Sequence, residues 1–464
     1  MHLKKYVGNR SFYRMVMTVA LPITIQNGIS TFVSLLDNLM VGRLGTEAMS
    51  GVSVVNQFLF IFNLLIFGAV SAAGIFMAQY HGKEDTEGEK YTFRFKFFIC
   101  ALCCVAGVAV LWLFSDQLIS LFLKGSSDGG DPVLTLEMGR QYLFIMLIGL
   151  LPFSVSNVYA SSMRETGDTV TPMTVSLISV ATNFVFNYLL IFGSLGFPRL
   201  EVRGAAAATV IARTVEMLIL VIRTHAKKGK YTFIVGALRS FYIPGRLFRQ
   251  IIVRGFPLIF NEFFWSMAVT TVNQCYSTRS LDVVAASSIY TTLYNVFSVA
   301  CLAMGSAISI VVGNLLGAGD VERAKDTDRK MTAFSVFCGV LTGLLMISVA
   351  WLFPKVYNTT DSVRELATFM IIISGAMMPF TAFVNAAYFT IRSGGQVIVT
   401  VLFDSVFMWV ILVPVVFALS RFTGIEIHLL FAIGQITEAT KSILGMILLK
   451  KGNWARQIVA DNKP

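Results

Sequence analysis

The chain has 464 residues, of which 55% are hydrophobic and only 14% are charged, whereas about 25% of the residues in a soluble domain are charged. Together with a mean hydropathy of +0.72, this composition excludes an ordinary soluble domain. It indicates a polytopic membrane protein whose apolar spans occupy nearly the whole chain. The net charge of +11 does not indicate a nucleic-acid partner, because the basic residues follow the pattern of membrane topology described below.

Twelve apolar runs predict twelve transmembrane helices, since a span needs about 20 such residues. We expect an all-α polytopic fold of two pseudo-symmetric six-helix bundles, an N-terminal lobe over residues 1–230 and a C-terminal lobe over residues 231–464. A basic linker at 223–254 joins the two lobes. The runs cover residues 15–40, 50–78, 95–115, 138–160, 172–193, 204–222, 250–276, 283–312, 331–353, 364–390, 396–419 and 427–449.

The distribution of lysine and arginine predicts the orientation of these spans. With the N-terminus in the cytoplasm, the cytoplasmic parts hold 26 of the 37 basic residues and the outer loops hold 9. Cytoplasmic loops carry the excess of Lys and Arg, so both termini are expected in the cytoplasm. The expected location is the plasma membrane of a prokaryote, and the first apolar run lacks the features of a cleavable signal peptide.

The two sets of six runs are predicted to be copies of one another, because special residues coincide at nearly constant offsets. Six spans is an even number, so the copies share one orientation and their relating axis should follow the membrane normal, as in parallel-repeat transporters. A cleft between two such bundles is the expected architecture. The matches are Pro22 with Pro257 and Gly82 with Gly317 at an offset of 235, Pro152 with Pro379 at 227, and Glu216 with Glu438 at 222.

Asp37 is the first candidate site residue, because it lies on an apolar first span that contains no cation to neutralise it. A carboxylate at the bilayer centre costs at least about 2.5–3.5 kcal/mol, which favours a functional acid facing water or protein. Its expected partners are polar residues of the fifth span, Ser176, Ser179, Asn183 and Asn187, which are spaced along one helical face. Such a site suits a proton, or Na⁺ with its preference for oxygen ligands.

Four further acids lie within predicted spans. Glu262 and Asp404 have no basic neighbour in sequence, so we interpret them as coupling sites; Na⁺ is possible at Glu262, Asp404 or Asp37. Glu216 and Glu438 each lie three residues from a basic residue, Arg213 and Lys441, and can form a neutral pair on one helical face. Whether this second pair of acids is structural or coupled stays open.

A further set of polar residues follows the same helical faces and is predicted to line the substrate cleft. With 39 Phe and 20 Met in the chain, the wall of this cleft is expected to be aromatic and pliable, which suits varied organic cations. The cysteines show no metal-ligand spacing, and no resident metal or cofactor is expected. The cleft residues are Asn27, Ser34, Asn56, Gln57, Ser266, Asn273, Tyr290 and Tyr294.

The order and spacing of several segments resemble the multidrug and toxic compound extrusion (MATE) family over residues 10–455. The segments are ALPITIQNGISTFVSLLDNLMVGRLG, NFVFNYLLIFG, FPLIFNEFFWS and FDSVFMWVILVP. The resemblance implies twelve helices in two lobes and an exporter driven by a proton or Na⁺ gradient. Asp37 matches the first-helix acid of the family and Glu262 the seventh-helix acid. Asn183 and Asn187 match positions where one branch carries an Asn and an Asp, and this departure weighs against a two-carboxylate proton relay.

We therefore expect a cation-coupled antiporter that exports amphipathic, often cationic, organic compounds by alternating access, working as a monomer in the lipid bilayer. The alternative is a lipid-linked oligosaccharide flippase of the same superfamily, which the scarcity of basic residues inside the spans disfavours. An intramembrane enzyme is not expected. All four histidines lie at or beyond the span ends, and no HExxH motif occurs.

Overall fold

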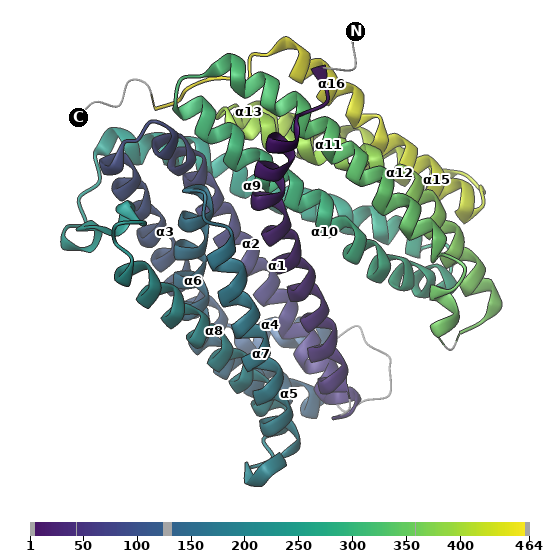
Figure 1. Cartoon of the computed structure of the whole chain (residues 1–464). Coiled ribbons are helices and arrows are strands. Elements are labelled where there is room, and N and C mark those ends of the chain that lie inside the picture. The colour runs from purple at the N-terminus through teal and green to yellow at the C-terminus, as the bar shows by residue number, and fades with distance from the viewer. Residues whose placement is uncertain (1–4, 43, 124–131, 358, 460–464) are drawn as a thin grey trace. The chain divides into compact units, whose positions relative to one another are not determined.

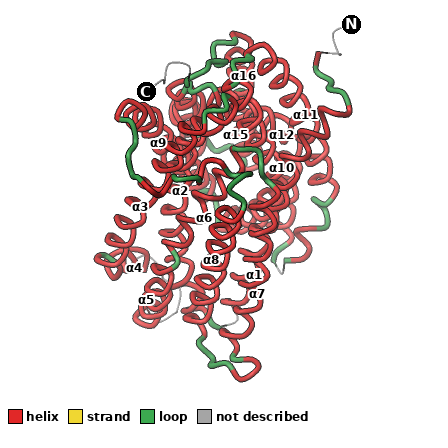
Figure 2. Tube along the Cα trace, turned by 60° about the vertical axis from the view of Figure 1, so that its left-hand side comes forward, coloured by secondary structure: helices red, strands yellow, loops and turns green. Residues whose placement is uncertain are grey.

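A computed structural model describes residues 5–42, 44–123, 132–357 and 359–459. In these ranges the chain is helical and contains no β-strand (Figures 1 and 2). The all-α prediction is confirmed.

Nine helical segments are long and apolar enough to cross a membrane among the described residues, and a bent pair of helices adds a tenth. The pair is α5 (Pro132–Ile148) and α6 (Leu150–Glu165), bent by 45° at Gly149. The nine are α1 (Arg10–Gly42), α2 (Thr46–Gly82), α3 (Thr86–Leu113), α7 (Val170–Phe192), α8 (Glu201–Ala226), α10 (Leu281–Gly317), α11 (Val321–Ser348), α12 (Asp361–Ser393) and the run Val397–Phe422.

Two further helical segments occupy predicted spans without meeting those limits. The helix α9 (Gly245–Ser277) carries Asn261 and Glu262 in the middle of its apolar stretch, which lowers its hydropathy. The last run is broken at Thr440 into α15 (Ile427–Ala439) and α16 (Lys441–Lys451). With these two, the helices follow the twelve predicted spans in order.

Short elements complete the chain. The run Val397–Phe422 consists of α13 (Val397–Val401), two π-helical segments, η6 (Leu402–Val406) and η7 (Met408–Leu412), and α14 (Val413–Phe422). The helix α4 (Ser115–Leu123) follows α3. The remaining 3-10 turns are η2 (Ser194–Gly196), η3 (Thr232–Ile234), η4 (Ala237–Arg239) and η5 (Phe353–Val356).

The chain forms two compact units. The N-terminal unit comprises Ile25–Met77 and Asp85–Ile251, and the C-terminal unit comprises Met1–Thr24, Ala78–Glu84 and Ile252–Pro464. The first part of α1 and the last turn of α2 therefore belong to the C-terminal unit. The predicted division of the chain at residue 230 stays a prediction.

Each unit has its own apolar core. In the N-terminal unit the core includes Ile66, Phe93 and Val158 from α2, α3 and α6. In the C-terminal unit α11 and α12 approach closely through Gly343 and Gly375, where a side chain would overlap the facing backbone. Small residues allow such close packing of spanning helices, where dispersion rather than the hydrophobic effect holds them together.

The repeated Gly-x-x-Asp motif serves the same purpose in both copies. Asp85 caps α3 by accepting a hydrogen bond from the Gly88 amide at 2.9 Å, and Asp320 caps α11 by accepting one from Arg323 at 3.2 Å. Both aspartates satisfy backbone donors that a helix start leaves free. The offset of 235 therefore relates equivalent structures as well as equivalent residues.

Candidate functional site: buried acids in each unit

Asp37 of α1 is half-buried and bonded to one side-chain amide of α7, that of Asn187, in the N-terminal unit. Asn187 Nδ2 donates to Asp37 Oδ1 at 2.6 Å and to Asn183 Oδ1 at 3.0 Å. Asn183 Nδ2 in turn donates to the Thr209 hydroxyl of α8 at 3.3 Å. The prediction that the fifth span supplies the partners of Asp37 is confirmed for Asn187, whereas Ser179 donates to the Ala212 carbonyl instead.

The charge of Asp37 has no basic partner among the described residues. The Asn187 side chain is only 1% exposed, and its Oδ1 has no hydrogen-bond partner in the described part of the chain. A buried acceptor left unpaired is costly. Asn187 Oδ1 can therefore accept a hydrogen bond from an added donor or bind a cation.

Glu262 of α9 lies beside a buried base in the C-terminal unit. Its carboxylate accepts a hydrogen bond from the Tyr388 hydroxyl at 2.8 Å, and Arg392 Nη1 lies 3.6 Å from Glu262 Oε1. Arg392 is 1% exposed and also donates to the Tyr388 hydroxyl at 3.3 Å. Glu262 therefore has a basic partner that is distant in the sequence, and its coupling role stays a prediction. The predicted span ends at residue 390, but α12 continues to Ser393 and places Arg392 inside the unit.

Asp404 lies in the π-helical segment η6 and forms an ion pair with Lys441. It also accepts a hydrogen bond from Asn261 Nδ2 at 2.9 Å. Asn261 is fully buried, and its Oδ1 accepts from the Ser405 hydroxyl at 2.7 Å. Asp404 likewise has a basic partner outside its own span, and its coupling role stays a prediction.

Neither predicted neutral pair forms a direct ion pair among the described residues, although Glu216 and Glu438 still interact electrostatically with Arg213 and Lys441. Lys441 pairs with Asp404 rather than with Glu438, because the break at Thr440 interrupts the helical spacing between residues 438 and 441. The Arg213 guanidinium lies 4.7 Å from the centre of the Phe153 ring and has no ion pair with Glu216 among the described residues.

The predicted cleft residues are distributed over both units. Asn56 accepts a hydrogen bond from the Tyr142 hydroxyl at 3.4 Å, and Tyr290 packs edge-on against Phe431 and beside Tyr294, with ring centroids 5.4 and 5.6 Å apart. The side chain of Ser34 lies outside the described residues. The others are half-buried (Asn27, Ser266) or exposed (Gln57, Asn273).

A further buried ion pair, in the N-terminal unit, was not predicted from the sequence either. Lys96 of α3 is fully buried and pairs with Glu165 at the end of α6, with the Ser161 hydroxyl 3.1 Å from its Nζ. The predicted span begins at residue 95, so Lys96 lies at its very end, whereas α3 begins at Thr86 and encloses Lys96. In the described part of the chain, no three His, Cys, Asp or Glu side chains come together as metal ligands.

This fold, with charged groups enclosed in each of two units of apolar helices, is that of a polytopic helical membrane protein. The family model of MatE matches residues 22–189 and 257–418. The chain therefore belongs to the MatE family, which is a family of transporters rather than enzymes.

Curated relatives and solved structures resemble the chain over nearly its whole length. The "Probable multidrug resistance protein NorM" of Thermotoga maritima is 25% identical over 454 residues, covering 96% of this chain and 93% of the relative. The "Probable multidrug resistance protein YoeA" of Bacillus subtilis is 23% identical, covering 90% and 89%. An outward-facing multidrug resistance MATE family transporter of the MOP superfamily superposes with a TM-score of 0.84 at 18% identity, covering 97% and 98%. These comparisons do not support the flippase alternative.

Proposed function

We propose that this chain is an antiporter that exports amphipathic, often cationic, organic compounds, and that Asp37 is the residue where the coupling cation binds. The observation that carries the proposal is the contrast between the acids: among the described residues Asp37 is bonded to the Asn187 amide and to no base, whereas Glu262 and Asp404 each have a base. An acid that already holds a fixed cation has little affinity for a second one.

The arrangement around Asp37 favours a proton as the coupling ion. A protonated carboxyl group gains an O–H donor, and Asn187 Oδ1 is a buried acceptor without a partner. Protonation removes the charge that would attract a cationic substrate, so proton and substrate compete. Exchange of one proton for one organic cation moves no net charge, so the pH gradient supplies the energy, about 1.4 kcal/mol per pH unit. The names of the relatives, which refer to multidrug resistance, support organic substrates.

We further propose that the protein works as a monomer in the plasma membrane of a prokaryote, with both termini in the cytoplasm and no resident cofactor. The excess of basic residues in the predicted cytoplasmic parts supports this orientation.

Efflux from proteoliposomes tests the proposal. Vesicles loaded with a fluorescent organic cation should release it under an imposed pH gradient but not under an imposed Na⁺ gradient. Asp37→Asn should abolish this release while the protein still folds. Release driven by Na⁺ alone would overturn the choice of ion, and full release by Asp37→Asn would overturn the site.

A further inference from the structure

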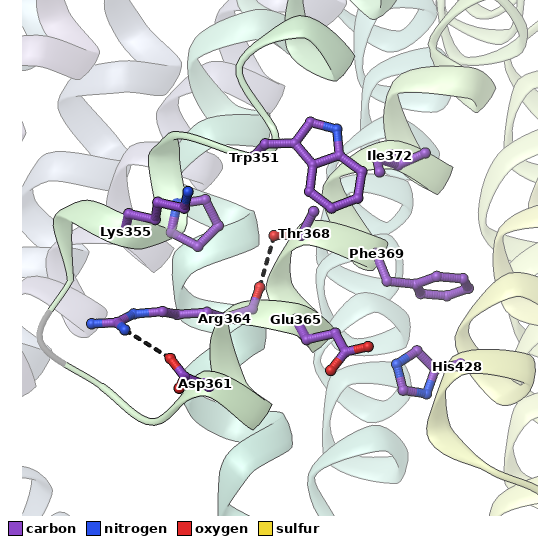
Figure 3. A pocket seen from close by; sticks show the side chains of 10 residues that line it. Trp351, Lys355, Asp361, Arg364, Glu365, Thr368, Phe369, Ile372 and His428 are labelled. Carbon is purple, nitrogen blue, oxygen red and sulfur yellow. Dashed lines mark hydrogen bonds and ion pairs between the residues drawn. The ribbon is translucent and has the colours of Figure 1, made fainter.

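A cavity of about 640 Å³ opens in the C-terminal unit where α11 ends and α12 begins. Its wall includes Trp351 and Lys355 from the connection between these helices, the first three turns of α12, and His428 at the start of α15 (Figure 3). None of these residues takes part in the proposed transport site.

The wall changes from charged to apolar along one face of α12. Arg364 and Glu365 lie in its first turns, whereas Phe369 and Ile372 lie one and two turns further into the span. Because α12 is long and apolar enough to cross a membrane, we expect its charged start near the lipid headgroups and its apolar turns among the acyl chains. Trp351 is 68% exposed beside this boundary, as tryptophans at membrane interfaces are.

The charged part of the cavity offers one unpaired group of each sign. Arg364 is engaged, because its Nη1 lies 2.9 Å from Asp361 Oδ1 and its Nη2 donates to the Tyr357 carbonyl. Neither Lys355 nor Glu365 has a hydrogen-bond or ion-pair partner among the described residues. The ammonium of Lys355 and the carboxylate of Glu365 therefore remain available to a ligand.

The apolar part offers aromatic surfaces beside the carboxylate. The Phe369 and His428 rings pack edge to face with centroids 4.8 Å apart, and in Figure 3 the Glu365 carboxylate points toward His428. A carboxylate next to aromatic rings suits an ammonium group. Lys355 disfavours a simple cation in the same cavity, and Glu365 disfavours a simple anion.

We propose that this cavity binds a zwitterionic phospholipid of the phosphatidylethanolamine class. The phosphate contacts Lys355, the primary ammonium contacts Glu365, and the start of one acyl chain lies along Phe369 and Ile372. Charge-assisted hydrogen bonds to both ends of the headgroup give the selectivity.

Thermal unfolding of the purified full-length protein in detergent tests this site. Phosphatidylethanolamine, phosphatidylcholine and phosphatidylglycerol, with identical acyl chains, are titrated in turn. A lipid that binds only the folded state raises the unfolding midpoint. Phosphatidylethanolamine should bind about tenfold more tightly than the other two, the ratio that one charge-assisted contact supplies. Glu365→Gln should remove this preference, and Lys355→Met should weaken the binding of all three lipids.

Two matched variants serve as controls. Glu426→Gln and Arg421→Met change exposed charged residues before α15 that do not line the cavity, and they should leave the preference intact. The proposal is overturned by equal binding of the three lipids, by an unchanged preference in Glu365→Gln, or by phosphoethanolamine without acyl chains binding as tightly as the lipid. The test does not depend on transport, so its failure leaves the role of Asp37 untouched.

Discussion

Gly82 at the end of α2 and Gly317 at the end of α10 lie in a reciprocal contact. A Cβ on Gly82 would overlap the Asn314 carbonyl of α10, and a Cβ on Gly317 would overlap the Gln79 carbonyl of α2. The offset of 235 residues converts each half of this contact into the other. The two repeats therefore meet through equivalent residues within the C-terminal unit.

We expect Gly82→Ala and Gly317→Ala each to destabilise the protein by about 1–3 kcal/mol or more, because the added methyl group meets rigid backbone. Thermal unfolding in detergent measures the effect. Gly28→Ala is the control, since nothing lies within 4 Å of a Cβ at that position of α1. Unfolding midpoints for the two variants that equal that of the control would contradict the close crossing.

The C-terminal segment after α16 is bonded to the end of α2 through Gln79, which is fully buried. Gln79 Nε2 donates to the Ser393 and Arg456 carbonyls at 3.0 and 3.2 Å, and its Oε1 accepts from the Ile458 amide at 2.7 Å. Gln79→Ala leaves these backbone groups without partners and should cost about 2–3 kcal/mol of stability. Gln274→Ala, at an exposed position of α9, should be neutral. Equal stability of the two variants would show that the segment is not held through Gln79.

The pair of Asp404 and Lys441 should behave as a structural ion pair. Asp404→Asn or Lys441→Met alone leaves a buried charge without its partner and should destabilise by about 3–5 kcal/mol. The double variant should regain most of this loss, which a double-mutant cycle of unfolding free energies measures. It should also keep efflux driven by the pH gradient. Loss of coupling in a stable double variant would assign the coupling role to Asp404 after all.

Asp168, between α6 and α7, should make stability depend on pH outside the membrane. Burial raises the pKa of Asp168, but hydrogen bonds from Lys230 and Tyr231 at 2.5 and 2.7 Å, together with Thr171, outweigh it and lower the pKa from 3.8 to about 2. A depressed pKa in the folded state stabilises the protein above pH 3.8, and this contribution is lost as the pH falls toward 2.

Asp168→Asn should therefore cost about 1–2 kcal/mol at pH 7 and progressively less as the pH falls below 3.8. Unfolding midpoints measured over this pH range test the prediction. Asp116→Asn is the control, because its ion pair with Arg140 is long, at 3.8 Å, and about half exposed. If Asp168→Asn lowers the unfolding midpoint by the same amount at every pH, the proposed pH dependence of stability is contradicted.

The sequence predicted the elements of the fold well, because spanning helices need long apolar runs and the repeat supplied a second copy of each signal. The predicted link between Asp37 and the fifth span was also confirmed, since residues 183 and 187 share one helical face. Helical periodicity places such residues on a common surface without any knowledge of the tertiary fold.

The partners of the C-terminal acids were not predictable in the same way. The Glu262–Arg392 contact spans 130 residues of sequence, and the Asp404–Lys441 pair depends on a helix break at Thr440 that no glycine or proline marks. Both depend on tertiary packing. One sequence feature could have indicated these partners: Lys96 and Arg392 each lie close to the end of an apolar run. A helix that is longer than the predicted span can enclose such a basic residue in the interior.

Proton release on substrate binding tests the role of Asp37 most directly. Calorimetric titration of the purified protein with an organic cation, near neutral pH and in two buffers with different ionisation enthalpies, gives the number of protons released per bound substrate. Competition at Asp37 predicts release by the wild-type protein, up to about one proton, and none by Asp37→Asn. Equal proton release by both proteins would contradict the account.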